Sequence, residues 1–298
     1  MPMITRFAPS PTGPLHLGHA YSALLAQDMA GAAGGTFLLR LEDIDRSRAR
    51  PEWEAQIFAD LHWLGLRWPE PVLRQSDRMT AYEAALDDLW QRGLLYACTC
   101  TRRDISDALS APQEGVPTHG PDGPIYPGTC RPAPDAVAPT QPRPKSGTYR
   151  LNIGRAVAVL AGEPTAPVLH VVETGPGPNH GSTDVPLAHL AHTIGDVVLA
   201  RAGMGTSYHL SVVVDDAAQQ ITHVVRGADL AEATVIHVLL QRLLGLPTPT
   251  YHHHRLIRDA AGKRLAKRDD ARAIRLYRDM GATPADIRAL VGLSPLAP

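Results

Sequence analysis

The chain has 298 residues, a net charge of −1 at pH 7 and a composition in which 44% of the residues are hydrophobic. A chain of this length buries about 75% of the surface that its unfolded form exposes, so one large domain with a small insertion needs no disulfide scaffold. No apolar run approaches the ~20 residues of a membrane span and Met1–Phe7 has no targeting pattern, which excludes a membrane partner and predicts a cytoplasmic protein.

The N-terminal part has the pattern of a βαβ unit. The predicted elements are, in chain order, a strand at 3–8, a Pro/Gly turn at 9–14, a helix at about 17–33 and a strand at 36–41. Gly34 and Gly35 end the helix. A strand, a helix and a second strand at this spacing form a right-handed crossover between parallel strands. The pattern therefore predicts an α/β fold built on a Rossmann-like doubly wound parallel sheet.

The remaining elements divide the chain into four predicted parts. Helices are expected at 53–64 and 80–92, a strand at 94–97, strand-like runs within 208–225 and mainly helices from Ala231 onwards. The stretch 110–146 is rich in Pro, Gly, Ala and Thr, a composition that does not hold regular structure by itself. The predicted parts are the first half of the sheet domain at 1–97, a Pro-rich insertion at 98–150, the second half at 151–250, and a basic loop with C-terminal helices at 251–298.

Basic residues are concentrated near the C-terminus. Residues 254–278 contain nine Lys or Arg against three Asp, a local charge of +6, so the rest of the chain carries −7. Such a run is either a solvated helix face or a contact surface for nucleic acid. Two of the three lysines in the chain, Lys263 and Lys267, fall within this stretch. A Lys ammonium is a compact, flexible point charge that suits a moving phosphate.

The turn after the first predicted strand has the composition of an anion site. Pro9–His19 places glycines between a strand and a helix, where backbone N–H groups and the helix dipole favour a phosphate. An ordinary turn with two surface histidines is the alternative. The segment 11–19 resembles the ATP-binding HIGH element of class I aminoacyl-tRNA synthetases, with His16-Leu-Gly-His19 in the HIGH positions. The preceding Arg6-Phe-Ala-Pro-Ser10 is similar to the form found in the glutamyl and glutaminyl branch.

This resemblance implies roles for the residues of the turn. In the family, the matching positions bind ATP and contribute to catalysis, which assigns both roles to His16 and His19 and ATP binding to Gly18. The segment before them helps to bind the amino acid, which implies contacts from Arg6, Phe7, Ala8, Pro9 and Ser10.

Class I enzymes pair this turn with a lysine-containing KMSKS loop, and residues 262–269 are similar to it. Aligning 264–268 with the five positions puts Lys267 at the second lysine, which implies ATP binding and stabilisation of the leaving pyrophosphate. Ala266 replaces the serine and Arg264 the first lysine, and Lys263 is a substitute for the latter. A basic helix-capping loop is the alternative interpretation.

A glutamate substrate needs cations for its carboxylates and an anion for its ammonium group. Arg6 and Arg226 are candidates for the carboxylates, and Glu42, at the end of a predicted strand, is the candidate for the ammonium. Residues 206–216 and 224–230 resemble two glutamate-contacting stretches of the glutamyl branch, which implies that Tyr208, Arg226 and Glu42 bind glutamate. Taken singly, each residue also has a structural explanation.

The three cysteines, Cys98, Cys100 and Cys130, form an odd set that points to a metal site or to buried inert thiols. A tetrahedral zinc site needs a fourth ligand. The pattern resembles the zinc site of the glutamyl-queuosine tRNA(Asp) synthetases, a branch of the same family, which implies that Tyr126 completes one structural zinc site per chain. His119 lies within the intervening insert and is a rival ligand.

The resemblance spans roughly residues 3–280 and implies an ATP-dependent ligase that uses Mg²⁺ with ATP. Because the chain ends soon after the lysine loop, the expected reaction is that of the queuosine branch: activation of L-glutamate and its transfer to queuosine, with the anticodon stem-loop of tRNA(Asp) as partner. A truncated glutamyl-tRNA synthetase that charges tRNA(Glu) and an inactive zinc-stabilised RNA-binding module are the alternatives. No protein partner is evident, and the oligomeric state stays open.

Overall fold

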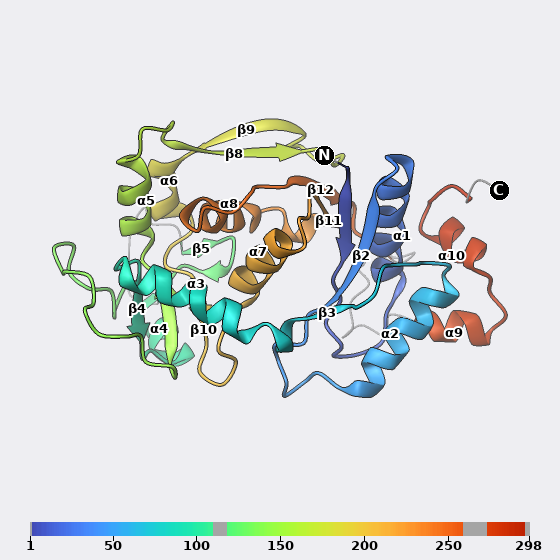
Figure 1. Cartoon of the computed structure of the whole chain (residues 1–298), viewed down its shortest axis with the longest axis horizontal. Coiled ribbons are helices and arrows are strands. Elements are labelled where there is room, and N and C mark those ends of the chain that lie inside the picture. The colour runs from blue at the N-terminus through green and yellow to red at the C-terminus, as the bar shows by residue number, and fades with distance from the viewer. Residues whose placement is uncertain (1, 110–117, 259–272, 296–298) are drawn as a thin grey trace.

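The computed structural model describes residues 2–109, 118–258 and 273–295 (Figure 1). Its central feature is a mostly parallel sheet in two parts. The first part has the order β1 (Ile4–Phe7), β2 (Thr36–Leu41), β3 (Leu73–Arg74), and the second has the order β11 (His223–Gly227), β12 (Thr250–His254), β8 (Val168–Glu173), β9 (Gly181–Pro186). Among the described strands of this sheet, only β9 and β8 pair antiparallel.

The two parts of the sheet meet at the start of β1. The Thr222 backbone N–H donates to the Ile4 carbonyl at 3.0 Å, and the Ile4 N–H donates to Thr222 Oγ1 at 2.8 Å. The strands β1 and β2 are parallel with α1 (Leu17–Ala32) between them, as the βαβ pattern predicted. The predicted Rossmann-like α/β fold is therefore confirmed.

Helices cover both faces of the sheet (Figure 1). The elements α1, α2 (Pro51–Trp63), α9 (Ile274–Asp279) and α10 (Pro284–Leu290) enclose one apolar core with β1 and β2. The elements α3 (Met79–Gln91), α5 (Ile153–Ala161), α6 (Leu187–Thr193), α7 (Tyr208–Ala218) and α8 (Thr234–Leu243) enclose the other. Buried alanines of α1 allow a close approach to the sheet, where Thr5 Oγ1 donates to the Ala26 carbonyl at 2.8 Å.

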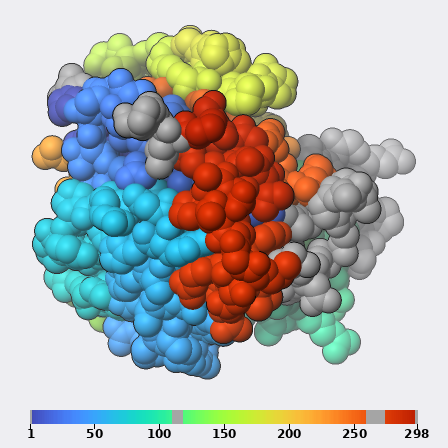
Figure 2. Space-filling view, turned by 90° about the vertical axis from the view of Figure 1, so that its right-hand side faces the viewer, coloured from blue at the N-terminus to red at the C-terminus, as the bar shows by residue number. Residues whose placement is uncertain are grey.

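The C-terminal helices pack on the N-terminal third of the chain, as Figure 2 shows. Arg288 grips the Asp28 carboxylate with both terminal nitrogens, at 3.2 and 2.6 Å. Ile274 and Ile287 are fully buried against the core around α1. None of the described helices is both long and apolar enough to cross a membrane.

Two elements differ from the sequence expectation. Tyr208–Ala218 is the helix α7 and not a strand: Ser207 caps it, and because Val212 and Val213 are both buried, the run shows no polar face that reveals a helical period. Thr250–His254 is the strand β12 in a region expected to be mainly helical. Its three histidines give it no apolar alternation, and its place beside β11 is set by tertiary pairing.

The Pro-rich region belongs to a lobe beside the main sheet. An antiparallel sheet of β4 (Leu95–Cys98), β7 (Thr148–Leu151) and β10 (Val198–Ala200) forms its base, and α4 (Arg102–Leu109) follows β4 in the chain. Within 118–147 the regular structure is the hairpin of β5 (His119–Gly120) and β6 (Gly123–Pro124), in line with the composition of this stretch. The buried Asp196 carboxylate ties the lobe together by accepting from Arg131 Nε at 2.6 Å and from the Ile153 N–H at 2.9 Å.

Candidate functional site

A cavity of about 1070 Å³ opens at the carboxyl ends of β1, β2 and β11. This is the usual place for a ligand in an open α/β sheet. Every described residue that the sequence assigned to ATP or glutamate lines it: Arg6, Phe7, Ala8, Pro9, Ser10, His16, Gly18, His19, Glu42, Tyr208 and Arg226. Lys267, with Lys263, Arg264 and Ala266, lies outside the described residues. The described residues on either side of this segment lie at the cavity. Ile257 lines it, and Ala273 forms a β-bridge with His16, which also lines it.

The two histidines of the HIGH-like turn cap helix α1. The Gly18 N–H donates to His16 Nδ1 at 3.1 Å, and the His16 N–H donates to His19 Nδ1 at 3.2 Å. Their ring centroids are 3.8 Å apart. A Cβ on Gly18 would meet the His16 ring at 3.0 Å. Gly18 therefore makes room for the folded-back His16 ring, which refines its expected role of admitting a nucleotide.

Arg6 belongs to a buried network in which positively and negatively charged side chains alternate. Arg6 donates to both oxygens of Asp216, at 3.0 and 3.2 Å, and Arg40 links Asp216, at 2.7 Å, to Glu42, at 3.2 Å. Burial acts to raise the pKa of Asp216, but Arg6 and Arg40 outweigh it and hold that pKa below its ordinary range. Burial raises the pKa of Glu42 against the opposing effect of Arg40. Among the described residues, Arg6 Nη1 has no hydrogen-bond partner, which leaves a donor for a ligand.

Arg226 is held by four hydrogen bonds at the cavity wall. Its Nε donates to His253 Nε2 at 3.0 Å and its Nη1 to His237 Nδ1 at 3.0 Å. Its Nη2 donates to Thr234 Oγ1 at 2.8 Å and to the Leu230 carbonyl at 3.2 Å. A guanidinium has five N–H donors, so one stays available. The arrangement presents a cation of fixed orientation to the cavity.

Tyr208 lies close enough to both Arg226 and Arg6 to be affected by their charges. Its ring stacks edge-on with those of His209 and His237, each with a centroid distance of 5.6 Å. Burial raises the pKa of its hydroxyl, so the phenol stays protonated and can donate to a carboxylate. Helix α7, which carries Tyr208 and Asp216, is anchored through Asp215, whose Oδ2 accepts from Tyr82 Oη at 2.6 Å.

Several residues of the site were missed by the sequence interpretation. The partners Arg40, Asp216, His237, His253 and Glu173 give no motif of their own. Arg40 alone is a charged residue inside an otherwise apolar run, which is a signal of a buried ion pair. The cavity rim also carries cations, Arg48, Arg102 and Arg201, that no pattern singled out.

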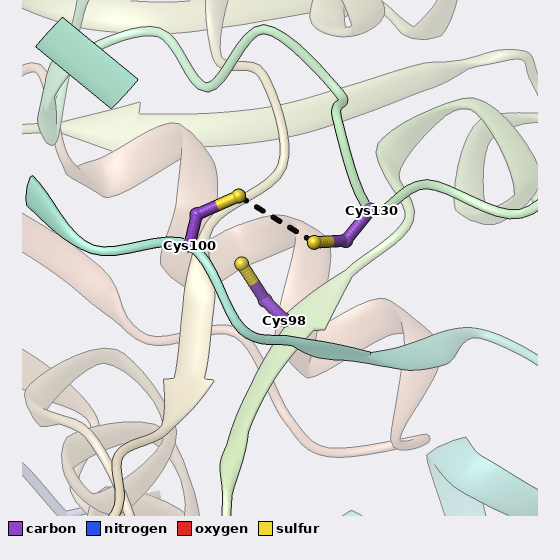
Figure 3. A group of neighbouring side chains, drawn as sticks. All are labelled: Cys98, Cys100 and Cys130. Carbon is purple, nitrogen blue, oxygen red and sulfur yellow. Dashed lines mark hydrogen bonds between the residues drawn. The ribbon is translucent and has the colours of Figure 1, made fainter. Parts of the chain in front are cut away.

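The three cysteines converge in the lobe, and Figure 3 shows their sulfur atoms pointing toward a common centre. All three Sγ atoms lie within 4.8 Å of one another, and Cys100 and Cys130 are 3.5 Å apart. Tyr126 Oη lies 3.2 Å from Cys100 Sγ and 3.5 Å from Cys98 Sγ. Four ligands around zinc stand about 3.8 Å from one another when Zn–S is about 2.3 Å. The donor set therefore fits a tetrahedral zinc ion.

The surroundings of this cluster suit anionic ligands. Arg150 Nε donates to Cys98 Sγ at 3.3 Å, and its guanidinium carbon lies 3.9 Å from the centre of the Tyr126 ring. The hydrogen bond from Tyr126 lowers the pKa of Cys130 to about 6, which favours a thiolate. His119, the rival ligand, is not part of the group of described side chains within 4.8 Å, and it is exposed with Nδ1 3.1 Å from Thr118 Oγ1.

Comparison with known proteins gives concordant matches. The family model of the catalytic domain of class I tRNA synthetases (E and Q) matches residues 2–152 and 181–296. The chain is 62% identical over 291 residues to the Glutamyl-Q tRNA(Asp) synthetase of Rhodobacter capsulatus, covering 98% of this chain and 100% of that protein. It is 43% identical to the protein of the same name from Nocardia farcinica, covering 98% of this chain and 86% of that protein.

Solved structures share the fold. A glutamate tRNA ligase from Elizabethkingia meningosepticum, in complex with its amino acid, superimposes with a TM-score of 0.71 at 24% identity, and the match covers 98% of this chain. A glutamate-tRNA synthetase from Elizabethkingia anophelis superimposes with a TM-score of 0.72 at 23% identity. The chain spans 60% and 63% of the length of these two proteins.

Proposed function

The chain belongs to the family of class I glutamyl and glutaminyl tRNA synthetase catalytic domains, and on that premise we propose that it activates L-glutamate with ATP and transfers it to queuosine in the anticodon of tRNA(Asp). The observation that carries this proposal is the match along the full length of the Rhodobacter capsulatus protein, whose name states that specificity. The proposed compartment is the cytoplasm, where ATP and tRNA are available.

The cavity supports glutamate as the amino acid. We assign the two carboxylates of glutamate to Arg6 and Arg226, each of which retains an N–H donor, and the ammonium group to Glu42. Tyr208 and the segment Phe7–Ser10 complete the pocket. Arginine suits this task because its planar fork matches a carboxylate and stays charged. Asp216 and Arg40 behind the pocket keep Arg6 and Glu42 in place.

Activation joins an oxygen of the glutamate α-carboxylate to the α-phosphorus of ATP and releases pyrophosphate with its electron pair. His16, Gly18 and His19 stand at the helix N-terminus where the phosphates are proposed to bind, and Lys267 is proposed to stabilise the leaving pyrophosphate. Mg²⁺ would accompany ATP and be held mainly by its phosphates. In the second step an acceptor hydroxyl of queuosine attacks the carbonyl carbon of the adenylate and AMP leaves.

The cysteine cluster is proposed to hold one structural zinc ion through Cys98, Cys100, Cys130 and Tyr126. Four protein ligands leave no open position for substrate, so the ion would add stability to the lobe and take no part in catalysis. Arg150 offsets the negative charge of the ligands.

The proposed function is tested by transfer of radiolabelled glutamate, with ATP, to three purified RNAs: tRNA(Asp) with queuosine, tRNA(Asp) without it, and tRNA(Glu). Label on queuosine-containing tRNA(Asp) alone is the expected result. Label on tRNA(Glu) would instead make the chain a glutamyl-tRNA synthetase. Absence of glutamate-dependent ATP–pyrophosphate exchange would leave an RNA-binding module without catalysis.

A further inference from the structure

Two chains of hydrogen bonds run from Arg226, one to the carboxylate of Asp122 at the edge of the cavity and one to the carboxylate of Glu173. The first passes from Arg226 Nη1 to His237 Nδ1 (3.0 Å), from His237 Nε2 to His209 Nδ1 (3.1 Å) and from His209 Nε2 to Asp122 Oδ1 (3.1 Å). The second passes from Arg226 Nε to His253 Nε2 (3.0 Å) and from His253 Nδ1 to Glu173. His209, His237 and His253 are all buried.

The direction of every bond follows from Arg226. A guanidinium only donates, so the facing nitrogens of His237 and His253 must accept, and each neutral ring carries its proton on the other nitrogen. His237 then donates to His209, which in turn donates to Asp122, while His253 donates to Glu173. Burial together with Arg226 lowers the pKa of both His237 and His253, which keeps these rings neutral.

Asp122 reaches this chain from the cysteine lobe. It lies in the turn of the β5–β6 hairpin, four residues before Tyr126, and its side chain is 43% exposed. The hairpin packs closely against the end of α6, because a Cβ on Gly120 would stand 2.5 Å from the Thr193 carbonyl oxygen. The turn thus holds one carboxylate against His209 at the edge of the cavity.

We propose that Asp122 is a positioning residue for glutamate activation, which acts through His209 and His237 to fix the tautomers of both rings and the orientation of the Arg226 guanidinium. The inference rests on the proposed function, in which Arg226 binds a glutamate carboxylate. Without Asp122, His209 loses the acceptor that selects its Nε2–H tautomer. Its Nδ1 is then free to carry the proton and to repel the His237 N–H.

The test is ATP–pyrophosphate exchange with the full chain, in which glutamate and ATP are varied separately. Asp122→Ala is expected to raise the KM for glutamate about fivefold, with kcat and the KM for ATP within about twofold of wild type. Asp122→Asn, which keeps an acceptor oxygen, is expected to restore most of the loss. Asp135→Ala, at an exposed carboxylate in the same lobe, is the matched control and is expected to change neither KM.

Asp122 also lines the cavity, so a double-mutant cycle separates relay from direct contact with the substrate. In a His209→Ala background, Asp122→Ala is expected to add no further change in the KM for glutamate. A full effect of Asp122→Ala in that background, or no effect in the wild-type background, would overturn the proposal.

A second measurement does not depend on enzymatic activity. Long-range ¹H–¹⁵N spectra of the histidine rings are expected to show Nε2–H for His209 and His237 in wild type and a changed tautomer of His209 in Asp122→Ala. Nδ1–H at His237 in wild type would overturn the relay. If the rings show the expected tautomers but the protein has no glutamate-dependent ATP–pyrophosphate exchange, the hydrogen-bond relay stands and the proposed function is refuted.

Discussion

At the scale of single residues, the candidate site contains two arginines whose orientation is fixed by neighbouring side chains. Arg226 uses three nitrogens in four hydrogen bonds, and Arg6 uses two nitrogens on one carboxylate. A lysine in either place has the charge but not the planar fork. The identity of the cation, and not its charge alone, is therefore expected to decide the affinity for glutamate.

Arg226→Lys is expected to raise the KM for glutamate by about tenfold or more, because an ammonium has three N–H donors and cannot replace the four hydrogen bonds of Arg226 and still offer a donor to a carboxylate. The KM for ATP is expected to stay within about twofold of wild type. The assay is ATP–pyrophosphate exchange at varied glutamate. Arg103→Lys, at an exposed arginine of α4 outside the cavity lining, is the control. Equal effects of both substitutions would contradict the assignment.

The pH dependence of stability should report the Asp216 network. The folded protein holds the pKa of Asp216 below its ordinary value, so its unfolded state binds more protons on acidification. This contribution is fully present above about pH 4, the unfolded value, and is lost as the pH falls through the folded one. Asp216→Asn is expected to cost about 3 kcal/mol at pH 7, because Arg6 and Arg40 lose a buried partner.

Urea unfolding of wild type and Asp216→Asn from pH 7 down to acid gives the measurement. The difference in free energy of unfolding between the two proteins is expected to shrink as the pH falls below about 4. Asp135→Asn, at an exposed carboxylate, is expected to leave the wild-type profile unchanged. A difference that stays constant with pH would show that Asp216 is not held as the carboxylate.

The residues predicted from the sequence are those that lie on contiguous motifs. The segment Arg6–Ser10 and the turn His16–His19 were identified because their contiguous residues resemble the HIGH element of class I synthetases and the segment before it. His253 and Glu173 were not, because His253 meets Arg226, and Glu173 meets His253, only through the register of β11, β12 and β8. The roles of all these residues stay predictions until the substitutions are measured.

At the scale of elements, the start of helix α1 shows how local sequence builds the turn at which phosphates are proposed to bind. His16 and His19 cap the helix reciprocally, and Gly18 is the position over which the His16 ring folds. The sequence interpretation of α7 as a strand was wrong because the local sequence of this segment does not determine its form. That helix is buried nearly all round, so its core-facing valines resembled a strand, and only tertiary packing against α3 and α8 decides its form.

Gly18→Ala is expected to raise the KM for ATP by about tenfold, because the new methyl group displaces the His16 ring that caps the helix. The KM for glutamate should change less. Gly31→Ala is the matched control in the same helix, where a Cβ meets nothing within 4 Å. This control is expected to stabilise the protein by about 0.5–1 kcal/mol through helix propensity, with both KM values unchanged.

Exchange kinetics and thermal unfolding on both variants give the test. A Gly18→Ala protein with a wild-type KM for ATP would show that the folded-back His16 ring is not needed for ATP binding. A Gly31→Ala protein with the same kinetic defect would point to a general effect on helix α1 and not to the turn.

At the scale of the whole molecule, the sequence predicted the sheet domain and the strand at 94–97, which is β4, but not the sheet that β4 forms with β7 and β10 at the base of the lobe. The βαβ pattern is local, whereas β4, β7 and β10 come from segments about fifty residues apart and pair only in the folded chain. The three cysteines signalled that residues 98 and 130 approach each other, and the fourth ligand was left open between Tyr126 and His119. The bounds proposed for the four parts of the chain stay a prediction.

The geometry favours Tyr126 over His119 as the fourth ligand of the proposed zinc ion, and the matched substitutions are Tyr126→Phe and His119→Ala. Tyr126 Oη stands within 3.5 Å of two thiols, whereas His119 is exposed and outside the cluster. Wild type and His119→Ala are expected to keep one zinc per chain after dialysis against a mild chelator, measured by elemental analysis. Tyr126→Phe removes one ligand and is expected to lose zinc under the same conditions, with about a 10–100-fold lower affinity.

Thermal unfolding distinguishes loss of the metal from loss of packing. Because Tyr126 is buried against Tyr96 and Cys98, its ring contributes to the lobe even without the hydroxyl, and phenylalanine preserves that contribution. Adding a chelator to wild type is therefore expected to lower its Tm to that of Tyr126→Phe, and to have no further effect on the variant. Zinc retained by Tyr126→Phe and lost by His119→Ala would reverse the assignment and make the exposed histidine the ligand.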